Sequence, residues 1–202
     1  YTYELASREV ETFNVLYSQN ATDFEVLSNL YDGLVSVDTK DEVCPAIATS
    51  WETEDDGVTW TFHLRDDVTW VDVNGNEKAK FTSADFVTGL EWVLNYYKND
   101  ASNTSMPMEM IVGAEDYYNY TKELSQEEAT TMDTSKFLEM VGIETPDDYT
   151  VVYKCVSPKP YFPTVATYAC LFPAPKAQID ELGVDGFKAV TPETIWYNGP
   201  YT

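Results

Sequence analysis

The sequence predicts an α+β or mixed α/β domain, and three observations lead to this prediction. Residues 58–64 alternate between apolar and polar side chains, residues 86–97 repeat apolar side chains at helical spacing, and no regular strand–helix–strand repeat orders the elements. The chain has 202 residues, of which 44% are hydrophobic and 14% aromatic. This composition suits one folded domain, or one domain and part of another, and argues against disorder.

The first elements are an extended opening, a loop and a helix. Thr22 or Asp23 is the expected N-cap of this helix, and Gly33 is a natural stop. Between them, apolar residues recur at helical spacing: Val26, Leu27, Leu30, Tyr31 and Leu34. A short strand is expected at 34–37, followed by a polar turn.

Pro45 is expected to begin an irregular or short helical piece. After the turn signal at 55–57, the alternation of residues 58–64 predicts a half-buried strand, with Trp60, Phe62 and Leu64 on its buried face. Residues 68–81 then form a second extended segment around an Asn-Gly turn.

Thr82 is the expected cap of the next helix, with Asp85 at its third helical position. One apolar stripe runs along it: Phe86, Leu90, Val93 and Tyr97. We expect a loop at 98–107 and one or two helices within 108–141, with Ser125 as a cap.

The last part of the sequence predicts a strand at 147–156 and a short helix that ends at Gly183. One face of the strand carries Tyr149, Val151, Tyr153 and Cys155. Five prolines between 158 and 175 exclude one long helix there.

The charge excludes several classes of partner. Twelve basic and 35 acidic residues give a net charge of −23, which repels nucleic-acid backbones and disfavours adsorption to anionic lipid. No apolar run approaches the roughly 20 residues that span a bilayer. The start of the sequence does not have the composition of a signal peptide, so we expect any export leader to have been removed.

The cysteines leave two interpretations open. Cys155 and Cys170 either remain buried free thiols, like Cys44, or form a disulfide. One histidine and no CxxC pair give little support to a zinc site. Three sequons could carry glycans in a secreted protein, but they also arise by chance in a chain rich in Asn and Thr: Asn20, Asn103 and Asn119.

No residue pattern predicts catalysis. The only histidine, His63, lies within the predicted strand on the face of Thr59 and Thr61, and no GxSxG elbow accompanies it. Among 35 acidic residues a pair at glycosidase spacing is uninformative. The DVNGN segment at 72–76 has its glycine in the wrong position for a calcium loop, and phosphate-binding GxGxxG or GKS/GKT sequences are absent.

Five stretches, in order, resemble one family: the extracellular peptide receptors of ABC importers, a class that also binds dipeptides and nickel. They are VLSNLYDGLVSVD, CPAIATSWETEDDGVTWTFHLRDDVTWVD, FTSADFVTGLEWVL, DDYTVVYKCVSPKPYFPTVATYACLFPAPK and NGPYT. The segment WVDVNGNEKAKFT departs from the family's pattern, because its turn is longer and lacks a proline.

The resemblance implies a two-lobed clamp of the type II periplasmic-binding-protein kind. Chains of that family are more than twice this long. The expected division is therefore a first part of lobe I at 1–31, a small inserted domain at 32–172 and a return into lobe I at 173–202, with the second lobe absent.

The resemblance also implies a binding site. In such receptors the loop before the first helix lies along an extended peptide that is held mainly through its backbone. Here that loop predicts the ligand-contacting residues Ser18, Gln19, Asn20, Ala21 and Thr22. Gln19 stands about where some receptors carry an acidic residue for the peptide's amino group, so this contact is not expected here. The tryptophans at 51, 60, 70 and 92 are expected in the core rather than on the ligand.

The expected function is capture of peptides for an ABC permease by a monomer that needs no metal or cofactor and is not an enzyme. Its place is outside the cell, as a lipoprotein tethered to the surface, or in the periplasm. A secreted hydrolase domain acting on glycans or peptides is the alternative from another class. A receptor for nickel or a metal chelate is the alternative within the binding class.

Overall fold

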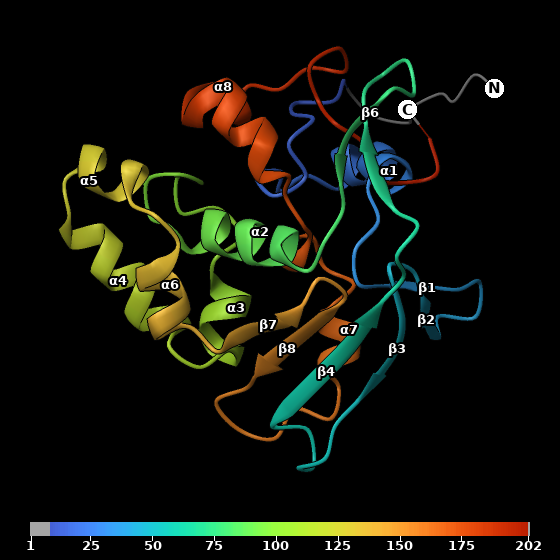
Figure 1. Ribbon diagram of the computed structural model, residues 1–202, viewed down its shortest axis with the longest axis vertical. Coiled ribbons are helices and arrows are strands. Elements are labelled where there is room, and N and C mark those ends of the chain that lie inside the picture. Colours follow the sequence, from blue (N-terminus) through green and yellow to red (C-terminus); the bar gives the residue numbers. More distant parts are fainter. Residues whose placement is uncertain (1–8, 202) are drawn as a thin grey trace.

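The computed structural model describes residues 9–201 and shows a four-stranded antiparallel sheet with helices beside it and a second group of elements above it (Figure 1). The first residues of the expected extended opening, 1–8, lie outside the described residues. The helices are α1 (Ala21–Leu30), α2 (Ala84–Leu94), α3 (Ser105–Met110), α4 (Ala114–Glu123), α5 (Gln126–Thr131), α6 (Ser135–Met140), α7 (Phe162–Val165), the 3-10 turn η1 (Ala169–Leu171) and α8 (Lys176–Lys188). The strands are β1 (Val35–Val37), β2 (Val43–Pro45), β3 (Ala48–Glu52), β4 (Thr59–Leu64), β5 (Thr69–Val71), β6 (Glu77–Lys80), β7 (Ile143–Asp147) and β8 (Thr150–Lys154).

The main sheet has the strand order β3-β4-β8-β7. β4 pairs with β8 so that Trp60 lies opposite Tyr153 and Phe62 opposite Val151. The β1–β2 and β5–β6 pairs form separate two-stranded sheets. Strands and helices therefore mix without a regular repeat, and the predicted fold class is confirmed.

The core of the sheet follows the alternation in the sequence. Trp60, Phe62 and Leu64 are buried, whereas the side chains between them are partly exposed. The Phe62 ring meets the Tyr153 ring edge to face at 6.1 Å and the Phe162 ring of α7 at 6.3 Å. α7 thus covers the apolar face, and the predicted strand at 58–64 is confirmed.

Helix α2 is buried on most of its circumference. The predicted apolar stripe is buried at Phe86, Leu90 and Val93, and Tyr97 lies beyond the end of the helix. Gly89 allows the chain after η1 to pass close to the helix, because a Cβ there would overlap the Phe172 carbonyl oxygen. α2 therefore packs backbone to backbone against a distant segment.

Two of the three predicted N-caps were wrong by one or more residues. Asn20 caps α1, with its Oδ1 accepting from the Thr22 N–H at 3.1 Å, so Thr22 and Asp23 lie in the first turn. In α2 the cap position is Ser83 rather than Thr82. The Asp85 carboxylate nevertheless accepts from the Thr82 N–H at 2.8 Å, which satisfies one of the donors exposed at the helix start.

Other elements also differ from the prediction. Pro45 ends β2 instead of starting a helical piece, and an edge strand tolerates proline because its outer N–H groups need no partner. Residues 105–140 form four short helices rather than one or two, with the predicted cap Ser125 in place at α5. α1 ends at Leu30, before the predicted stop at Gly33. Gly183 has non-helical backbone angles, so the first helical part of α8 ends there as predicted, and a second part continues to Lys188.

The end of the chain returns to the end of α1. Asn198 Nδ2 donates to the Asp32 carbonyl at 3.0 Å, and the Gly199 N–H donates to the Leu30 carbonyl at 3.0 Å. Tyr197 exchanges two backbone hydrogen bonds with Val71 of β5. The β5–β6 hairpin, α1 and the C-terminal segment consequently gather at the same end of the molecule (Figure 1).

No helix within residues 9–201 is long and apolar enough to cross a membrane.

Candidate functional site

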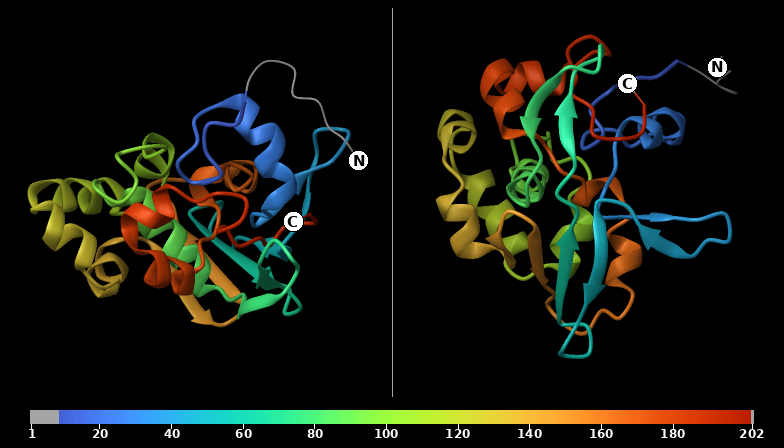
Figure 2. Two further views of the ribbon diagram at one scale, coloured as in Figure 1. Left: turned by 90° about the horizontal axis from the view of Figure 1, so that it is seen from above. Right: turned by 45° about the vertical axis from the view of Figure 1, so that its right-hand side comes forward.

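The loop at 16–20 lies between the start of α1 and the loop at 98–104, which joins α2 to α3. Seen from above, the two loops lie side by side, although more than 80 residues separate Leu16 from Asn99 and Asn103 in sequence (Figure 2). Contacts from both sides define the conformation of the 16–20 loop.

The side of α1 holds the loop through Asp23. This carboxylate is buried and accepts from the Ser18 hydroxyl at 2.8 Å and from the Glu11 N–H at 2.9 Å. The Ser18 hydroxyl oxygen in turn accepts from the Asn20 N–H at 3.2 Å. A carboxylate at a helix N-terminus is favoured by the helix dipole, so Asp23 stabilises α1 as well as the loop.

The opposite side holds the loop through asparagines. Asn103 Nδ2 donates to the carbonyls of Leu16 and Ser18 at 2.8 and 2.9 Å. Asn99 Nδ2 donates to the Leu16 carbonyl at 3.0 Å, while its Oδ1 accepts from the Trp92 indole at 2.8 Å. No local sequence pattern pointed to these two residues beyond an Asn-rich loop, because their partners lie more than 80 residues away in the chain.

The five predicted site residues divide into two kinds. Ser18 and Thr22 are buried and Asn20 is partly buried as the helix cap, so these three shape the loop. Gln19 and Ala21 are exposed. The Asn20 Nδ2 atom is buried and makes no hydrogen bond among the described residues.

Gln19 is the position at which the loop offers its backbone. Its N–H and C=O make no hydrogen bond within the described part of the chain, whereas the carbonyls of Leu16 and Ser18 are occupied. A free donor and acceptor on one exposed residue is what an extended peptide needs in order to pair with a protein by main-chain hydrogen bonds.

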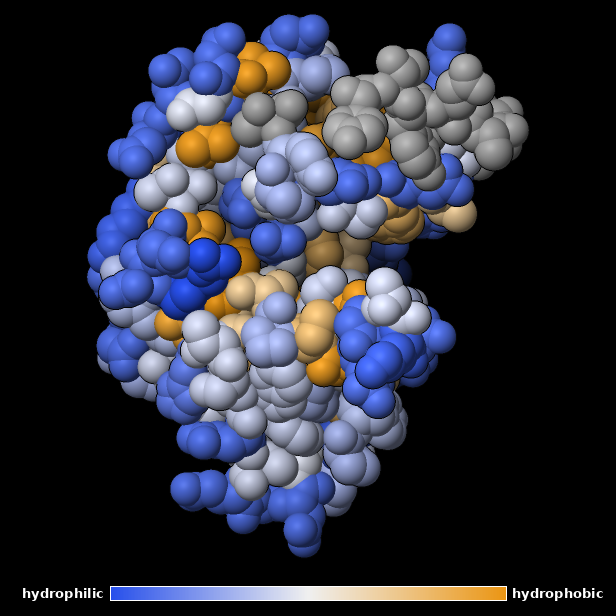
Figure 3. All heavy atoms as spheres, turned by 90° about the vertical axis from the view of Figure 1, so that its right-hand side faces the viewer, coloured by the Kyte–Doolittle hydropathy of each residue, from blue (hydrophilic) through white to orange (hydrophobic). Residues whose placement is uncertain are grey.

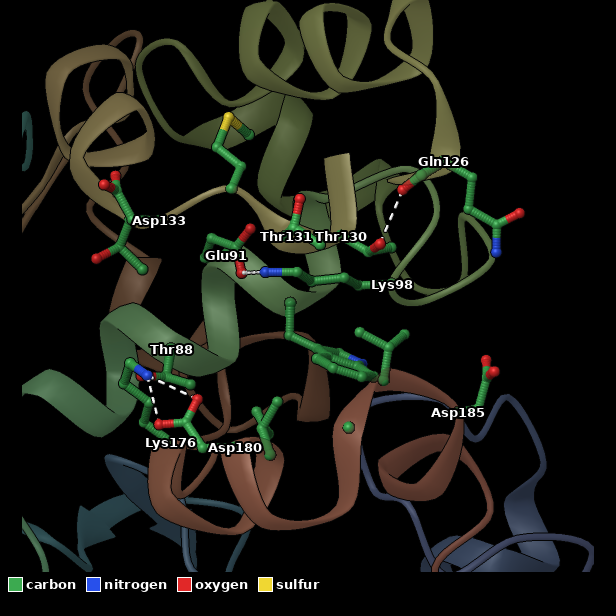
Figure 4. Close-up of a pocket in the computed structure, with 16 residues that line it drawn as sticks. Thr88, Glu91, Lys98, Gln126, Thr130, Thr131, Asp133, Lys176, Asp180 and Asp185 are labelled. Carbon is green, nitrogen blue, oxygen red and sulfur yellow. Dashed lines mark hydrogen bonds and ion pairs between the residues drawn. The ribbon is translucent and has the colours of Figure 1, made fainter. Parts of the chain in front are cut away.

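A separate cavity of about 630 Å³ lies between α2, the α5–α6 region and α8 (Figure 4). Its floor carries a buried ion pair in which Lys98 Nζ lies 2.8 Å from Glu91 Oε2. The other Glu91 oxygen accepts from the Tyr117 hydroxyl at 2.8 Å and from Asn95 Nδ2 at 3.1 Å. Burial beside this carboxylate raises the pKa of Tyr117 well above its usual value, so the phenol stays protonated.

The rim of this cavity is polar, and charged side chains lie on different sides of it. Asp133 and Asp185 lie at opposite ends in Figure 4, and Lys176 and Asp180 of α8 pair at 2.6 Å below Asp133 in this view. The lining residues include neither histidine nor cysteine. The buried pair is satisfied within the protein, which is the arrangement of a structural network rather than of a reactive group.

A smaller cavity of about 240 Å³ lies where the chain leaves α1 for β1, beside Tyr31, Gly33 and Phe172. Figure 3 shows the surface of this side of the molecule, which is hollowed between its upper and lower parts, with apolar residues in the hollow. Neither cavity includes residues 18–22.

The histidine considered for catalysis lies beside a carboxylate. His63 is half exposed on the outer face of the sheet, and its Nε2 lies 3.1 Å from Glu52 Oε1. Ser50 lies opposite His63 in the strand register, but no hydrogen bond joins their side chains. No group of three or more potential metal ligands occurs among residues 9–201.

The structure bears on the interpretations left open for the cysteines and the sequons. All three cysteines are free thiols, and burial raises the pKa of Cys155 to about 11 and that of Cys170 to about 12, which keeps both unreactive. Asn103 uses its side-chain amide in hydrogen bonds and that of Asn20 is buried, so Asn119 is the sequon residue that lies exposed.

The expected core position is confirmed for three of the four tryptophans, and the fourth is partly buried. Trp60, Trp70 and Trp92 are buried, and Trp51 is partly buried with its ring 6.4 Å from that of Phe62.

Comparisons with known proteins agree on one family. Residues 42–202 match the family described as bacterial extracellular solute-binding proteins, family 5 Middle. The chain is 32% identical over 201 residues to the oligopeptide-binding protein AliB of Streptococcus pneumoniae, and the match covers 100% of this chain and 28% of AliB. The chain therefore spans less than a third of the length of this relative.

Solved structures show the same fold. The OppA protein of Burkholderia pseudomallei superposes with a TM-score of 0.75 at 27% identity, over 96% of this chain and 33% of that one. The OppA protein of Haemophilus influenzae, solved in complex with the peptide RPPGFSPFR, gives a TM-score of 0.72 at 27% identity, over 93% of this chain and 32% of that one. On the strength of the match over residues 42–202, the chain belongs to family 5 of the bacterial extracellular solute-binding proteins.

Proposed function

We propose that this chain is part of the peptide receptor of an ABC importer, which captures extended peptides between two lobes and delivers them to a membrane permease. The observation that carries the proposal is the 16–20 loop. It is fixed from two sides, and its exposed residue Gln19 has a backbone N–H and C=O that make no hydrogen bond among residues 9–201. Main-chain pairing of this kind binds peptides with little dependence on their sequence.

The other predicted contacts take defined parts in this proposal. Gln19 and the exposed Ala21 face the peptide, and Ser18, Asn20 and Thr22 maintain the loop that presents them. Gln19 is uncharged, so the proposal assigns no ionic contact with the peptide's amino group to this loop.

We also infer the division of the chain into a first part of lobe I at 1–31, an inserted domain at 32–172 and a return at 173–202. The four-stranded sheet and α2–α6 all fall within 32–172. The hydrogen bond from the Gly199 N–H to the Leu30 carbonyl supports a return to the first part, whereas Asn198 bonds Asp32, the first residue of the inserted range. The β5–β6 hairpin belongs to the inserted range in sequence but pairs with Tyr197, so the boundary crosses this contact.

The partners and location follow from the same proposal. The receptor acts as a monomer outside the cell or in the periplasm, tethered as a lipoprotein, and meets an ABC permease. The relatives AliB and OppA are oligopeptide-binding proteins, and OppA of Escherichia coli is periplasmic. We propose no catalytic activity, since His63 pairs with Glu52 on an exposed sheet face and meets no nucleophile there.

Ligands that co-purify with the full-length protein test this function. The protein is purified without denaturation, its ligands are released with acid, and the released material is identified by mass spectrometry. Peptides of varied sequence are the expected result. A sample that is unfolded in guanidinium, washed and refolded before the release step gives the background. Recovery of only sugars, or turnover of a glycan or peptide substrate by the purified protein, would contradict the proposal and favour a hydrolase.

A further inference from the structure

The loop at 98–104 has an unusual backbone. Asp100, Ala101 and Asn103 have positive φ values of 48°, 58° and 58°. Asn and Asp adopt this region readily, but in alanine the Cβ atom crowds the following carbonyl oxygen and strains the backbone. Such strain persists only where surrounding contacts hold the backbone, and it often occurs at functional sites.

Contacts at both ends hold this loop in place. Lys188 at the end of α8 donates from Nζ to the Tyr97 carbonyl at 2.8 Å and lies 2.7 Å from Asp100 Oδ1. Asn99, near the start of the loop, is fully buried and links the Trp92 indole to the carbonyl of Ser102 near the loop's other end. The strained conformation is therefore fixed by α2 and α8 before any ligand is considered.

The loop directs two asparagine side chains, Asn99 and Asn103, at the candidate peptide-binding loop, and Asn103 is the one that reaches the carbonyl next to Gln19. Asn103 Nδ2 bonds two carbonyls of that loop, those of Leu16 and Ser18, on either side of Tyr17. Gln19, whose backbone groups are free, follows directly after the second of these carbonyls. The Asn103 amide thus fixes the peptide unit that leads into the proposed contact residue.

We propose that Asn103 is a positioning residue for peptide binding, which pre-organises the 16–20 loop from the inserted domain. This inference rests on the proposed function and deepens it. A loop that is already ordered does not lose that freedom when the peptide binds, so affinity rises without a direct contact. Asn103 itself touches no part of the peptide in this proposal.

The variant Asn103→Gly isolates the amide, because glycine adopts a positive φ without strain. The matched control is Ala101→Gly, which relieves strain in the same loop and leaves both hydrogen bonds intact. Both variants are made in the full-length receptor. Calorimetry measures the affinity for RPPGFSPFR and for a pool of random hexapeptides, and hydrogen exchange measures the backbone amides of residues 17–20 without peptide.

Asn103→Gly is expected to weaken peptide affinity about tenfold, because the loop must then be ordered when the peptide binds, and to speed exchange at residues 17–20. Ala101→Gly is expected to change neither. Faster exchange with unchanged affinity would overturn the proposal, because the amide would then order the loop without serving binding. Unchanged exchange would overturn it as well.

The experiment separates this inference from the function on which it rests. If the wild-type receptor binds neither probe, the proposed function fails. The exchange rates of residues 17–20 then still decide whether Asn103 orders the loop.

Discussion

Asp85 is a buried carboxylate in the first turn of α2, inside a motif that the sequence already suggested was a helix start. Burial raises its pKa to about 7, and the Thr82 N–H and the Trp70 indole only partly offset this effect. The folded state therefore keeps a proton that the unfolded chain releases between about pH 4 and pH 7. Its contribution to stability is greatest below pH 4 and falls as the pH rises towards 7.

Replacement of Asp85 by Asn is expected to remove this pH dependence. The amide oxygen can still accept from the Thr82 N–H, but the side chain cannot ionise, so the variant gains stability relative to wild type at pH 8 and loses that advantage at pH 4.5. By linkage the difference has an upper limit of about 4 kcal/mol. Urea unfolding at the two pH values measures it.

The control for Asp85→Asn is Glu115→Gln, which removes one negative charge from an exposed position in α4. It corrects for the relief of general repulsion in a chain with a net charge of −23. If both variants shift stability equally at both pH values, burial of Asp85 is not the cause.

At the scale of elements, the contact between α2 and the segment after η1 depends on Gly89. Alanine normally stabilises a helix interior relative to glycine by about 0.5–1 kcal/mol. Here the new Cβ would overlap the Phe172 carbonyl oxygen and approach the Ala174 nitrogen at 3.2 Å. The backbone would have to move apart, and the Ala174 N–H would lose its 2.9 Å bond to the Asp85 carbonyl.

Gly89→Ala is therefore expected to destabilise the protein by about 1–3 kcal/mol, the usual cost of overpacking, instead of stabilising it. Chemical denaturation measures the change. Thr88→Ala, at the neighbouring and more exposed position, raises helix propensity without this overlap and should be neutral or slightly stabilising. A gain in stability for Gly89→Ala would show that the two segments are not in close contact.

Individual strands differ in how well the sequence predicts them. β4 was predictable because Trp60, Phe62 and Leu64 alternate with polar residues and one face is buried. β3 and β7 were not, since each lies at an edge of the sheet and shows no alternation of buried and exposed residues. Their conformation comes from pairing with β4 and β8. This pairing leaves no periodic pattern in the sequences of β3 and β7.

The candidate site was predictable to a similar degree. The loop before α1 could be located by resemblance, but which of its side chains are buried could not, because Ser18 is buried through its bond to Asp23 and through packing. Asn99 and Asn103 could not be found at all, as they meet the loop only after more than 80 intervening residues have folded.

At the scale of the whole molecule, the described residues form one side of the proposed binding site. The free backbone groups at Gln19 lie at the surface, outside both cavities described above. A peptide bound there would remain hydrated along its other side, and water competes for the same hydrogen bonds. The match to this chain covers only about a third or less of the length of its relatives.

Residues 1–202 alone are consequently expected to bind peptides weakly, with a Kd above about 100 μM, which corresponds to less than roughly 5.5 kcal/mol of binding free energy. Calorimetry with RPPGFSPFR and random hexapeptides measures this value, and the circular dichroism spectrum of the same sample establishes that the chain is folded. The full-length receptor under the same conditions is the comparison. Micromolar binding by residues 1–202 would contradict the prediction, because the peptide would then need no second lobe to exclude water from its backbone.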